Sequence, residues 1–179
     1  MPYGLDQFVS DCRAILSADP GPQGREQVRQ NLERLLSERD FLQKYCGDEA
    51  PQGLKVLYED ADLGFQVLAH INEKPRVSPP HDHGESWAIY GQATEYTDMI
   101  EWERVDDGDP SRVELRPTKK YRLTPGHAGI YQDGKIHSID YPAKARFVRV
   151  TGTNLDRIHR VSFDLAAGKV NPMTPQRAT

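Results

Sequence analysis

Two short segments of this chain carry histidines at spacings that suit metal chemistry: Pro79-Pro80-His81-Asp82-His83-Gly84 and, later, Gly134-Lys135-Ile136-His137. Side chains at positions i and i+2 of a β-strand point to the same face, so His81 and His83 can share one face. His137, from a separate strand, can complete the coordination. Imidazole binds iron, zinc, copper and nickel, and three protein ligands leave positions open for a substrate or oxygen. The pattern therefore predicts a catalytic metal site rather than a structural one.

Other side chains near these segments are candidates for the walls of the same pocket. His70 is expected to face inward, either as a pocket residue and hydrogen-bond donor to a ligand or as a histidine that only packs. Trp87 can wall the pocket, and the hydroxyls of Tyr90 and Tyr131 can hold bound oxygen or substrate, with plain packing as the alternative. Because side chains alternate along a strand, Asp82 is expected to point to the face opposite His81 and His83. We therefore expect it to be a hydrogen-bonding support rather than a metal ligand.

Length and composition point to an ordinary single domain spanning residues 1–179, because 37% of its residues are hydrophobic. The net charge is −4 and the basic residues are scattered, so no nucleic-acid partner is expected. No apolar stretch approaches the roughly 20 residues needed to span a bilayer, and the N-terminus lacks a secretory pattern, so no membrane partner is expected. Cys12 and Cys46 are expected to be packed thiols, which favours a cytoplasmic location.

The first part of the chain, residues 1–50, has the pattern of helices. Apolar residues recur at helical spacing over 5–16, and Asp19-Pro20-Gly21-Pro22 ends that pattern. A second helix is expected over 23–45, with one apolar stripe and one face of mixed charge. The Pro51-Gln52-Gly53 turn ends the helical part.

From residue 54 to about residue 165 the period becomes that of strands. Apolar and β-branched runs at 54–59 and 63–71 are followed by two expected strands over 86–105, on either side of Gly91-Gln92. Many short strands separated by Pro, Gly and Asp turns indicate a sandwich or barrel. Residues 170–179 are expected to be a loose tail or a strap. Further strands are expected at 112–115, 120–123, 129–131, 136–140, 145–151 and 159–165.

The histidine segments resemble the two halves of the cupin metal motif. His81-Asp82-His83 is similar to the first half and Gly134-x-x-His137 to the second, with Pro125-Gly126 resembling the turn that often precedes it. This resemblance implies an all-β fold, the cupin-type double-stranded β-helix or jelly roll, with N-terminal α-helices packed beside it.

Within the cupins, the chain resembles the thiol dioxygenases, the group of cysteine dioxygenase and 3-mercaptopropionate dioxygenase. The stretch 57–83 is similar in spacing, and His81-Asp82-His83-x-x-Ser86 resembles the His-x-His-x-x-Ser segment of that group. Glu95-x-Thr97-x-x-x-x-Trp102 resembles its next hairpin. The usual cupin glutamate falls at Trp87, so the likeness implies a carboxylate-free set of three histidines holding Fe(II).

The chain departs from that group at several positions. The crosslinking cysteine of the mammalian members falls near Ala88, and the Ser-His-Tyr relay falls near Phe147, Arg149 and Thr151. The arginine that binds the substrate carboxylate falls near Lys55, where a lysine can pair only as a point charge. Arg149 is a second candidate for binding an anionic group. These departures leave the substrate and the reaction open.

The function implied by the resemblance is that of a mononuclear non-haem iron dioxygenase. It would oxidise a small organic thiol to a sulfinate at Fe(II), with the small-molecule substrate and dioxygen as its partners. Zn, Ni or Mn remain open as the metal, since imidazole sites are permissive, and a homodimer remains open. The alternatives are a three-histidine dioxygenase that cleaves a C–C bond of a diketone or hydroxylated aromatic, a non-redox lyase or isomerase, and a ligand-binding module.

Overall fold

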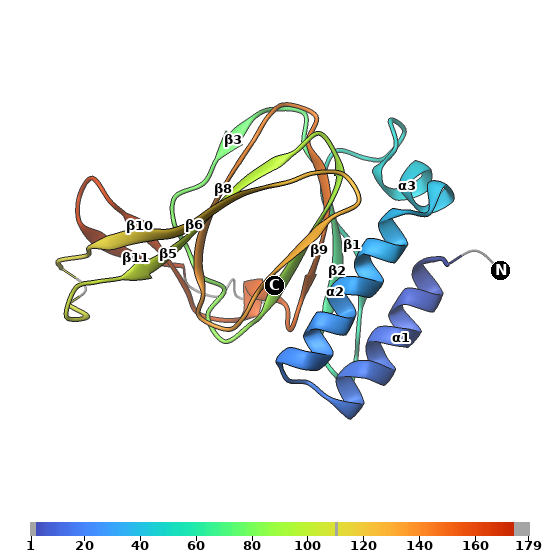
Figure 1. Cartoon of the computed structure of the whole chain (residues 1–179), viewed down its shortest axis with the longest axis horizontal. Helices are drawn as coiled ribbons and strands as arrows, with labels where there is room; N and C mark the ends of the chain where they lie inside the picture. Colours follow the sequence, from blue (N-terminus) through green and yellow to red (C-terminus); the bar gives the residue numbers. More distant parts are fainter. Residues whose placement is uncertain (1–2, 110, 174–179) are drawn as a thin grey trace.

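The structure is a computed structural model, and it describes residues 3–109 and 111–173. Three helices come first, and strands form most of the rest of the chain (Figure 1). The helices are α1 (Leu5–Ala18), α2 (Pro22–Leu36) and α3 (Arg39–Cys46). The strands are β1 (Gly53–Glu59), β2 (Gln66–Ile71), β3 (Arg76–Val77), β4 (Ala88–Thr94), β5 (Thr97–Arg104), β6 (Leu115–Leu123), β7 (Ala128–Tyr131), β8 (Ile136–Tyr141), β9 (Arg146–Thr151), β10 (Arg160–Asp164) and β11 (Lys169–Met173). A short 3-10 helix, Leu155–Arg157, precedes β10.

Two antiparallel sheets form the main body. One has the order β1-β2-β9-β4-β7 and the other the order β3-β8-β5-β6. The eight strands from β2 to β9 are divided between the two sheets in the order that defines a jelly roll. The expected all-β fold of cupin type with N-terminal helices is therefore confirmed.

The helices cover the outer face of the five-stranded sheet (Figure 1). Val28, Leu32 and Leu35 of α2 are fully buried there against the outward-facing apolar residues of β2, β4 and β9. A Cβ atom on Gly91 would lie 2.6 Å from Leu36 Cδ1 of α2, so the glycine permits this close approach. The expected turn at Gly91-Gln92 is wrong, because both residues lie inside β4. The chain turns at Glu95, which adopts a φ of 56°, and crosses to β5 in the other sheet.

The expected second helix over 23–45 is interrupted, so α2 and α3 are separate helices. The Ser37 hydroxyl donates a 2.6 Å hydrogen bond to the Arg34 carbonyl. The Ser37 N–H also donates to that carbonyl, at 3.1 Å. A serine that bonds to the preceding turn competes with continued α-helix, which explains the break.

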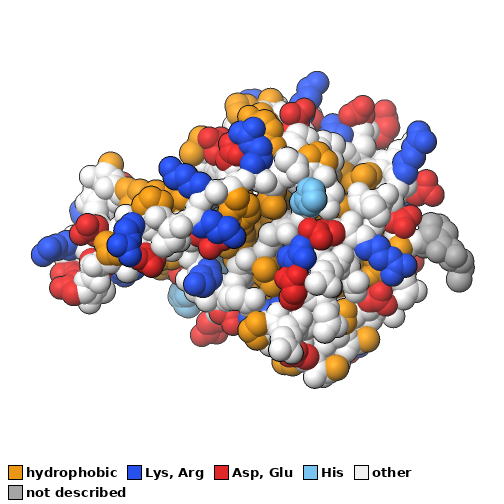
Figure 2. All heavy atoms as spheres, in the orientation of Figure 1, with side chains coloured by type: hydrophobic (Ala, Val, Ile, Leu, Met, Phe, Trp, Pro, Cys, Tyr) orange, Lys and Arg blue, Asp and Glu red, His pale blue; other side chains and the backbone are white. Residues whose placement is uncertain are grey.

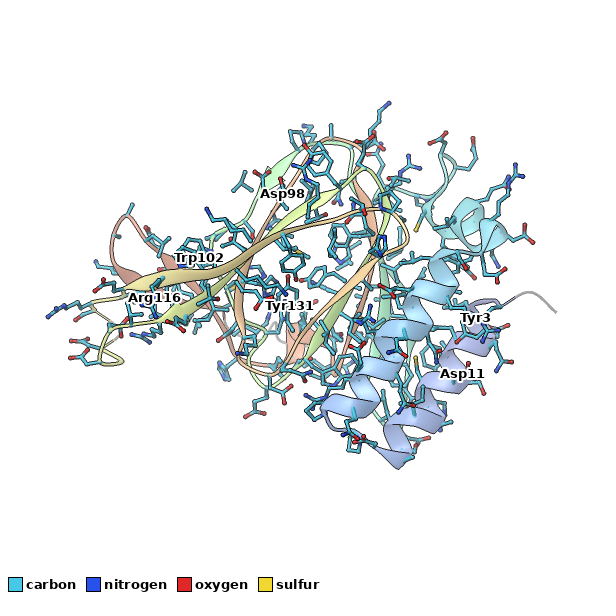
Figure 3. The ribbon with its side chains drawn as sticks, viewed as in Figure 1. Tyr3, Asp11, Asp98, Trp102, Arg116 and Tyr131 are labelled. Atoms are coloured by element: carbon cyan, nitrogen blue, oxygen red, sulfur yellow. The ribbon has the colours of Figure 1, made fainter. Side chains whose placement is uncertain are left out.

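Between the sheets lies a second, aromatic-rich core. Side chains alternate along each strand, so one face of β4 and β9 meets the helices and the other meets this interior. Tyr131 points into this interior and is 2% exposed (Figure 3). The buried members of this cluster are Ala88, Tyr90, Met99, Leu123, Tyr131, Tyr141, Ala145 and Phe147.

The last two strands form a hairpin that attaches beside the histidine segment. Ser162 of β10 forms an isolated bridge with His81, and the Phe163 N–H donates to the Pro80 carbonyl at 2.8 Å. The tail expected from residue 170 onward is thus partly wrong, because Lys169–Met173 is the strand β11 paired with β10. The remainder of that expected tail, 174–179, lies outside the described residues.

Charged side chains of both signs are interspersed over the face of the molecule shown in Figure 2. None of the described helices has the length and apolar character needed to cross a membrane.

Candidate metal site

Three histidines from two segments meet at one end of the interior. One ring nitrogen from each of His81, His83 and His137 lies within 4.8 Å of the others. His83 is 2% exposed and His137 is fully buried. In the described part of the chain, no carboxylate or thiol belongs to this cluster. The set of side chains expected from the sequence is therefore brought together by the fold.

Backbone pairing explains why His81 and His137 point the same way. The N–H of each donates to the carbonyl of the other at 2.9 Å, and such directly opposed residues place their side chains on one face. His83 lies two positions later, just before Gly84. Gly84 has a φ of 59°, and a Cβ there would lie 2.2 Å from the His159 carbonyl oxygen. Glycine is therefore needed for this turn.

Asp82 is a hydrogen-bonding support, as the sequence predicts. Its Oδ1 accepts hydrogen bonds from the N–H of Gly84 at 3.1 Å and of Val161 at 3.0 Å. Its own N–H donates to the Val161 carbonyl at 3.0 Å. These bonds fasten the β10–β11 hairpin to the segment that carries two of the histidines.

Three ring nitrogens of the cluster lack the protein partners that buried polar atoms normally have. His81 Nδ1 lies 3.0 Å from the Pro79 carbonyl, which can only accept, so this contact favours a proton on Nδ1 and a lone pair on Nε2. His83 Nδ1 and both nitrogens of His137 are buried without a hydrogen-bond partner among the described residues. A buried, unsatisfied polar atom costs about 1–3 kcal/mol. A metal ion bound by one nitrogen of each ring would satisfy His83 Nδ1 and one of the two His137 nitrogens, so the donor set fits such an ion.

The electrostatic environment keeps all three rings neutral. Burial is the largest cause that lowers the pKa of His81, His83 and His137, and for His83 and His137 the neighbouring rings lower it further. The positive charge of Arg149 acts in the same direction on all three. Neutral imidazole is the form that binds metal, so the site is prepared for a cation near neutral pH.

A cavity of about 230 Å³ opens beside His81. His70, Tyr90 and Arg149 line it, as the sequence analysis expected of pocket residues. His70 stacks on Phe147, with ring centroids 4.4 Å apart. Other side chains in the lining include Arg76, Tyr141, Arg160 and Ser162.

The two tyrosines lie against the histidines in different ways. The Tyr90 hydroxyl is 3.2 Å from His83 Nε2, so it can donate to that ring or turn toward a bound ligand. Tyr131 stacks on His137 at a centroid distance of 4.0 Å, and its hydroxyl is 2.5 Å from that of Tyr121. Burial raises the pKa of Tyr131 well above its ordinary value. Tyr131 thus fixes the plane of the His137 ring and remains protonated.

The expectation that Lys55 binds the substrate is wrong for this cavity. It is exposed on the edge strand β1 and pairs with Ala69, which packs with Ala50 on the outer face of the sheet. His70, the next residue along β2, points to the opposite face and lines the cavity. Lys55 does not line this cavity, so it is not placed to bind a substrate there.

The expectation that Trp87 forms a wall of the pocket is also wrong. It is buried in the helix-covered cluster, with the Arg25 guanidinium 5.8 Å from its ring centroid. The turn at Gly84 breaks the two-residue alternation after His83, so Trp87 faces away from the histidines. Sequence reasoning missed Arg160, whose only signal was that it alternates with Ser162 on the strand expected at 159–165.

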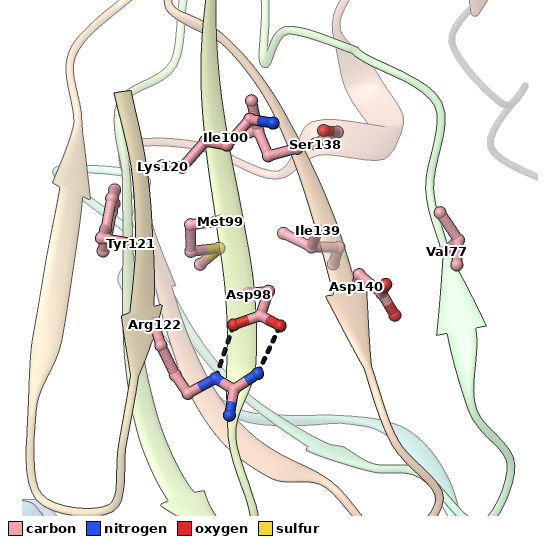
Figure 4. A pocket seen from close by; sticks show the side chains of 10 residues that line it. All are labelled: Val77, Asp98, Met99, Ile100, Lys120, Tyr121, Arg122, Ser138, Ile139 and Asp140. Atoms are coloured by element: carbon pink, nitrogen blue, oxygen red, sulfur yellow. Dashed lines mark hydrogen bonds and ion pairs between the residues drawn. The ribbon is translucent and has the colours of Figure 1, made fainter. Parts of the chain in front are cut away.

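A larger hollow, of about 490 Å³, lies on the four-stranded sheet (Figure 4). Its lining contains an ion pair between Asp98 and Arg122, with an N–O distance of 2.6 Å. No histidine or cysteine is among the described residues that line it. The smaller cavity is therefore the one associated with metal-binding chemistry.

Comparison with known proteins found no matching family model and no matching curated protein. Solved structures do match. KdgF from Halomonas sp. is 15% identical over 55% of this chain and 76% of its own, with a TM-score of 0.41. A cupin superfamily protein from Desulfitobacterium hafniense is 14% identical over 59% and 84%, with a TM-score of 0.42.

The Schizosaccharomyces pombe Cnp3 cupin domain is 11% identical, with a TM-score of 0.43. The match covers 56% of this chain and 60% of that domain. Such identities transfer neither a substrate nor a reaction. The strand order of this chain defines a double-sheet jelly roll, the architecture that cupins have, and its interior holds a three-histidine cluster suited to a metal ion.

Proposed function

We propose that this chain is a mononuclear metal-dependent dioxygenase that oxidises a small organic thiol to a sulfinate at Fe(II). One observation carries the proposal: three neutral imidazoles converge next to a cavity, and two of them, His83 and His137, are buried with unpartnered nitrogens. Leaving three buried nitrogens unsatisfied has no structural advantage, so a ligand of the cluster is the simplest reason for it.

The bound ferrous ion would supply a centre at which a thiolate and dioxygen meet. The overall reaction is RS⁻ + O₂ → RSO₂⁻, in which both oxygen atoms go to sulfur and no further reductant is needed. The ligands carry no charge, which favours binding of the anionic thiolate. Three protein ligands leave the remaining positions for the two substrates.

The residues around the cluster have distinct roles in this proposal. Arg149 neutralises an acid group of the substrate and thereby orients its thiol. The Tyr90 hydroxyl, close to His83, donates a hydrogen bond to oxygen or substrate. Phe147 and Tyr141 provide apolar walls that limit the access of water.

The test is metal content together with oxygen uptake. Protein purified without added metal is analysed for metal, then loaded anaerobically with ferrous ion and supplied with a panel of small thiols. His81→Ala should lose both iron and oxygen uptake. His127→Ala is the matched control, since the side chain of His127 is 69% exposed and lies outside the cluster.

Other results would assign another function. Oxygen uptake with diketones or hydroxylated aromatics, and none with thiols, would indicate a dioxygenase that cleaves C–C bonds. Zinc, nickel or manganese at the site with no oxygen uptake would indicate a non-redox enzyme. An absence of any metal would refute the proposal and leave a ligand-binding module.

A further inference from the structure

Two arginines from different strands converge on the cavity beside the histidines. Arg149 lies on β9 and Arg160 on β10, and both line the cavity. The Nε atom of each is buried without a hydrogen-bond partner among the described residues. Arg76 lines the same cavity as a third cation, at an exposed position of β3.

The positive charge of this cavity is not balanced within the described structure. None of its described lining residues is acidic. Arg149 forms no ion pair with a described residue, and Arg160 has one distant contact, 3.6 Å to the largely exposed Asp156. Burial is the main cause that lowers the pKa of Arg160, and the charge of Arg149 lowers it further, because the two guanidinium groups lie within electrostatic reach of each other. One guanidinium without an ion-pair partner and a second with only this distant one, both in a confined space, are costly unless an anion joins them.

We propose that the cavity selects a substrate carrying two negative charges besides the reacting group, one for Arg149 and one for Arg160. This inference rests on the proposed function for the identity of the reacting group, a thiol. It defines the substrate class as a small thiol bearing two acid groups. A single carboxylate would leave one guanidinium without a counter-charge.

The C-terminal hairpin supplies this second subsite. Asp82 binds the backbone of Val161, which fixes the neighbouring Arg160 relative to the histidine segment. Met173 of β11 also lines the cavity. A guanidinium in this fixed position can bind a carboxylate through two parallel hydrogen bonds.

Anion binding to metal-free protein tests the inference without requiring catalysis. The probes are succinate, butyrate and sulfate, measured by isothermal titration calorimetry at about pH 7.5, where carboxylic acids are ionised. Succinate should bind roughly tenfold to a hundredfold more tightly than butyrate, the difference expected for one charge-assisted hydrogen-bonded group. If sulfate binds as tightly as succinate, the cavity recognises one doubly charged group rather than two separate carboxylates. That result would overturn the inference of two acid groups.

Substitutions at Arg160 test whether this guanidinium binds the second carboxylate. Arg160→Gln should bring succinate down to the affinity of butyrate, whereas Arg160→Lys should retain part of the preference because it keeps the charge. Arg157→Gln is the matched control, since Arg157 is largely exposed and pairs with Glu59. Equal binding of succinate and butyrate, or an unchanged preference in Arg160→Gln, would overturn the inference.

A second arm separates this inference from the proposed function. Oxygen uptake by the ferrous protein is compared between thiols with one and with two carboxylates, and the latter should have the higher kcat/KM. Tight succinate binding without oxygen uptake from any thiol would refute the thiol reaction and retain the dianion site. Oxygen uptake with no preference between the two thiols would retain the reaction and refute the dianion site.

Discussion

His137→Leu should make the metal-free protein more stable, although it removes a fully buried residue. Both nitrogens of His137 are buried without a partner among the described residues. Each such atom costs about 1–3 kcal/mol. Leucine carries no polar atoms, so the substitution removes that cost.

The gain is reduced by lost contacts of the ring. His137 stacks on Tyr131 at 4.0 Å, and an aromatic pair contributes about 0.5–1.5 kcal/mol beyond its buried area. The net expectation is an increase of about 1 kcal/mol or more in the free energy of unfolding. For a protein of this size, about 1 kcal/mol corresponds to a rise in Tm of about 2–4 °C.

Metal should reverse this order of stability. A metal at a hundredfold excess over its Kd stabilises the native protein by about 2.7 kcal/mol. The variant lacks one ligand and should gain far less. Urea denaturation under argon, with and without ferrous ion, measures both effects, and His127→Leu should behave as the native protein does in each condition.

A loss of stability in metal-free His137→Leu would refute this reasoning. It would mean that the buried nitrogens have partners, such as ordered water, and that the cluster is a satisfied polar core. Equal metal stabilisation of the variant and the native protein would refute the assignment of His137 as a ligand.

Two further predictions concern neighbouring residues. Asp82→Ala removes the acceptor for the N–H groups of Gly84 and Val161, so it should lower the free energy of unfolding by about 2 kcal/mol and speed hydrogen exchange at Val161. Burial and then Arg149 lower the pKa of His70 well below 6.5, so the folded state binds fewer protons than the unfolded state. Stability should therefore fall as the pH drops below about 6.5. His70→Phe should reduce this fall by up to about 1.4 kcal/mol per pH unit in pH-dependent denaturation, and an unchanged slope would contradict it.

Local patterns in the sequence were sufficient for the order of helical and strand regions and for the three histidines, but not for the bounds of every element. The change from helical to two-residue periodicity near residue 54 predicts N-terminal helices and then strands, and the structure agrees. The two-residue spacing of His81 and His83 predicted that they point the same way, and the later turn at Gly134 precedes His137, which lies on β8. Three of the expected pocket residues, His70, Tyr90 and Arg149, also line the cavity.

The sequence by itself therefore determined the class of fold, the members of the three-histidine cluster and the alternation of faces along each strand. Tertiary structure decided which of the two faces is the interior, because that depends on where the helices pack. Lys55 was misplaced for this reason, because it lies on the face opposite the cavity. Trp87 was misplaced because the turn at Gly84 breaks the alternation and directs it toward the helices. Arg160 was missed because the pairing of β10 with the His81 segment joins residues far apart in the chain, and such pairing depends on the whole packed fold rather than on local periodicity.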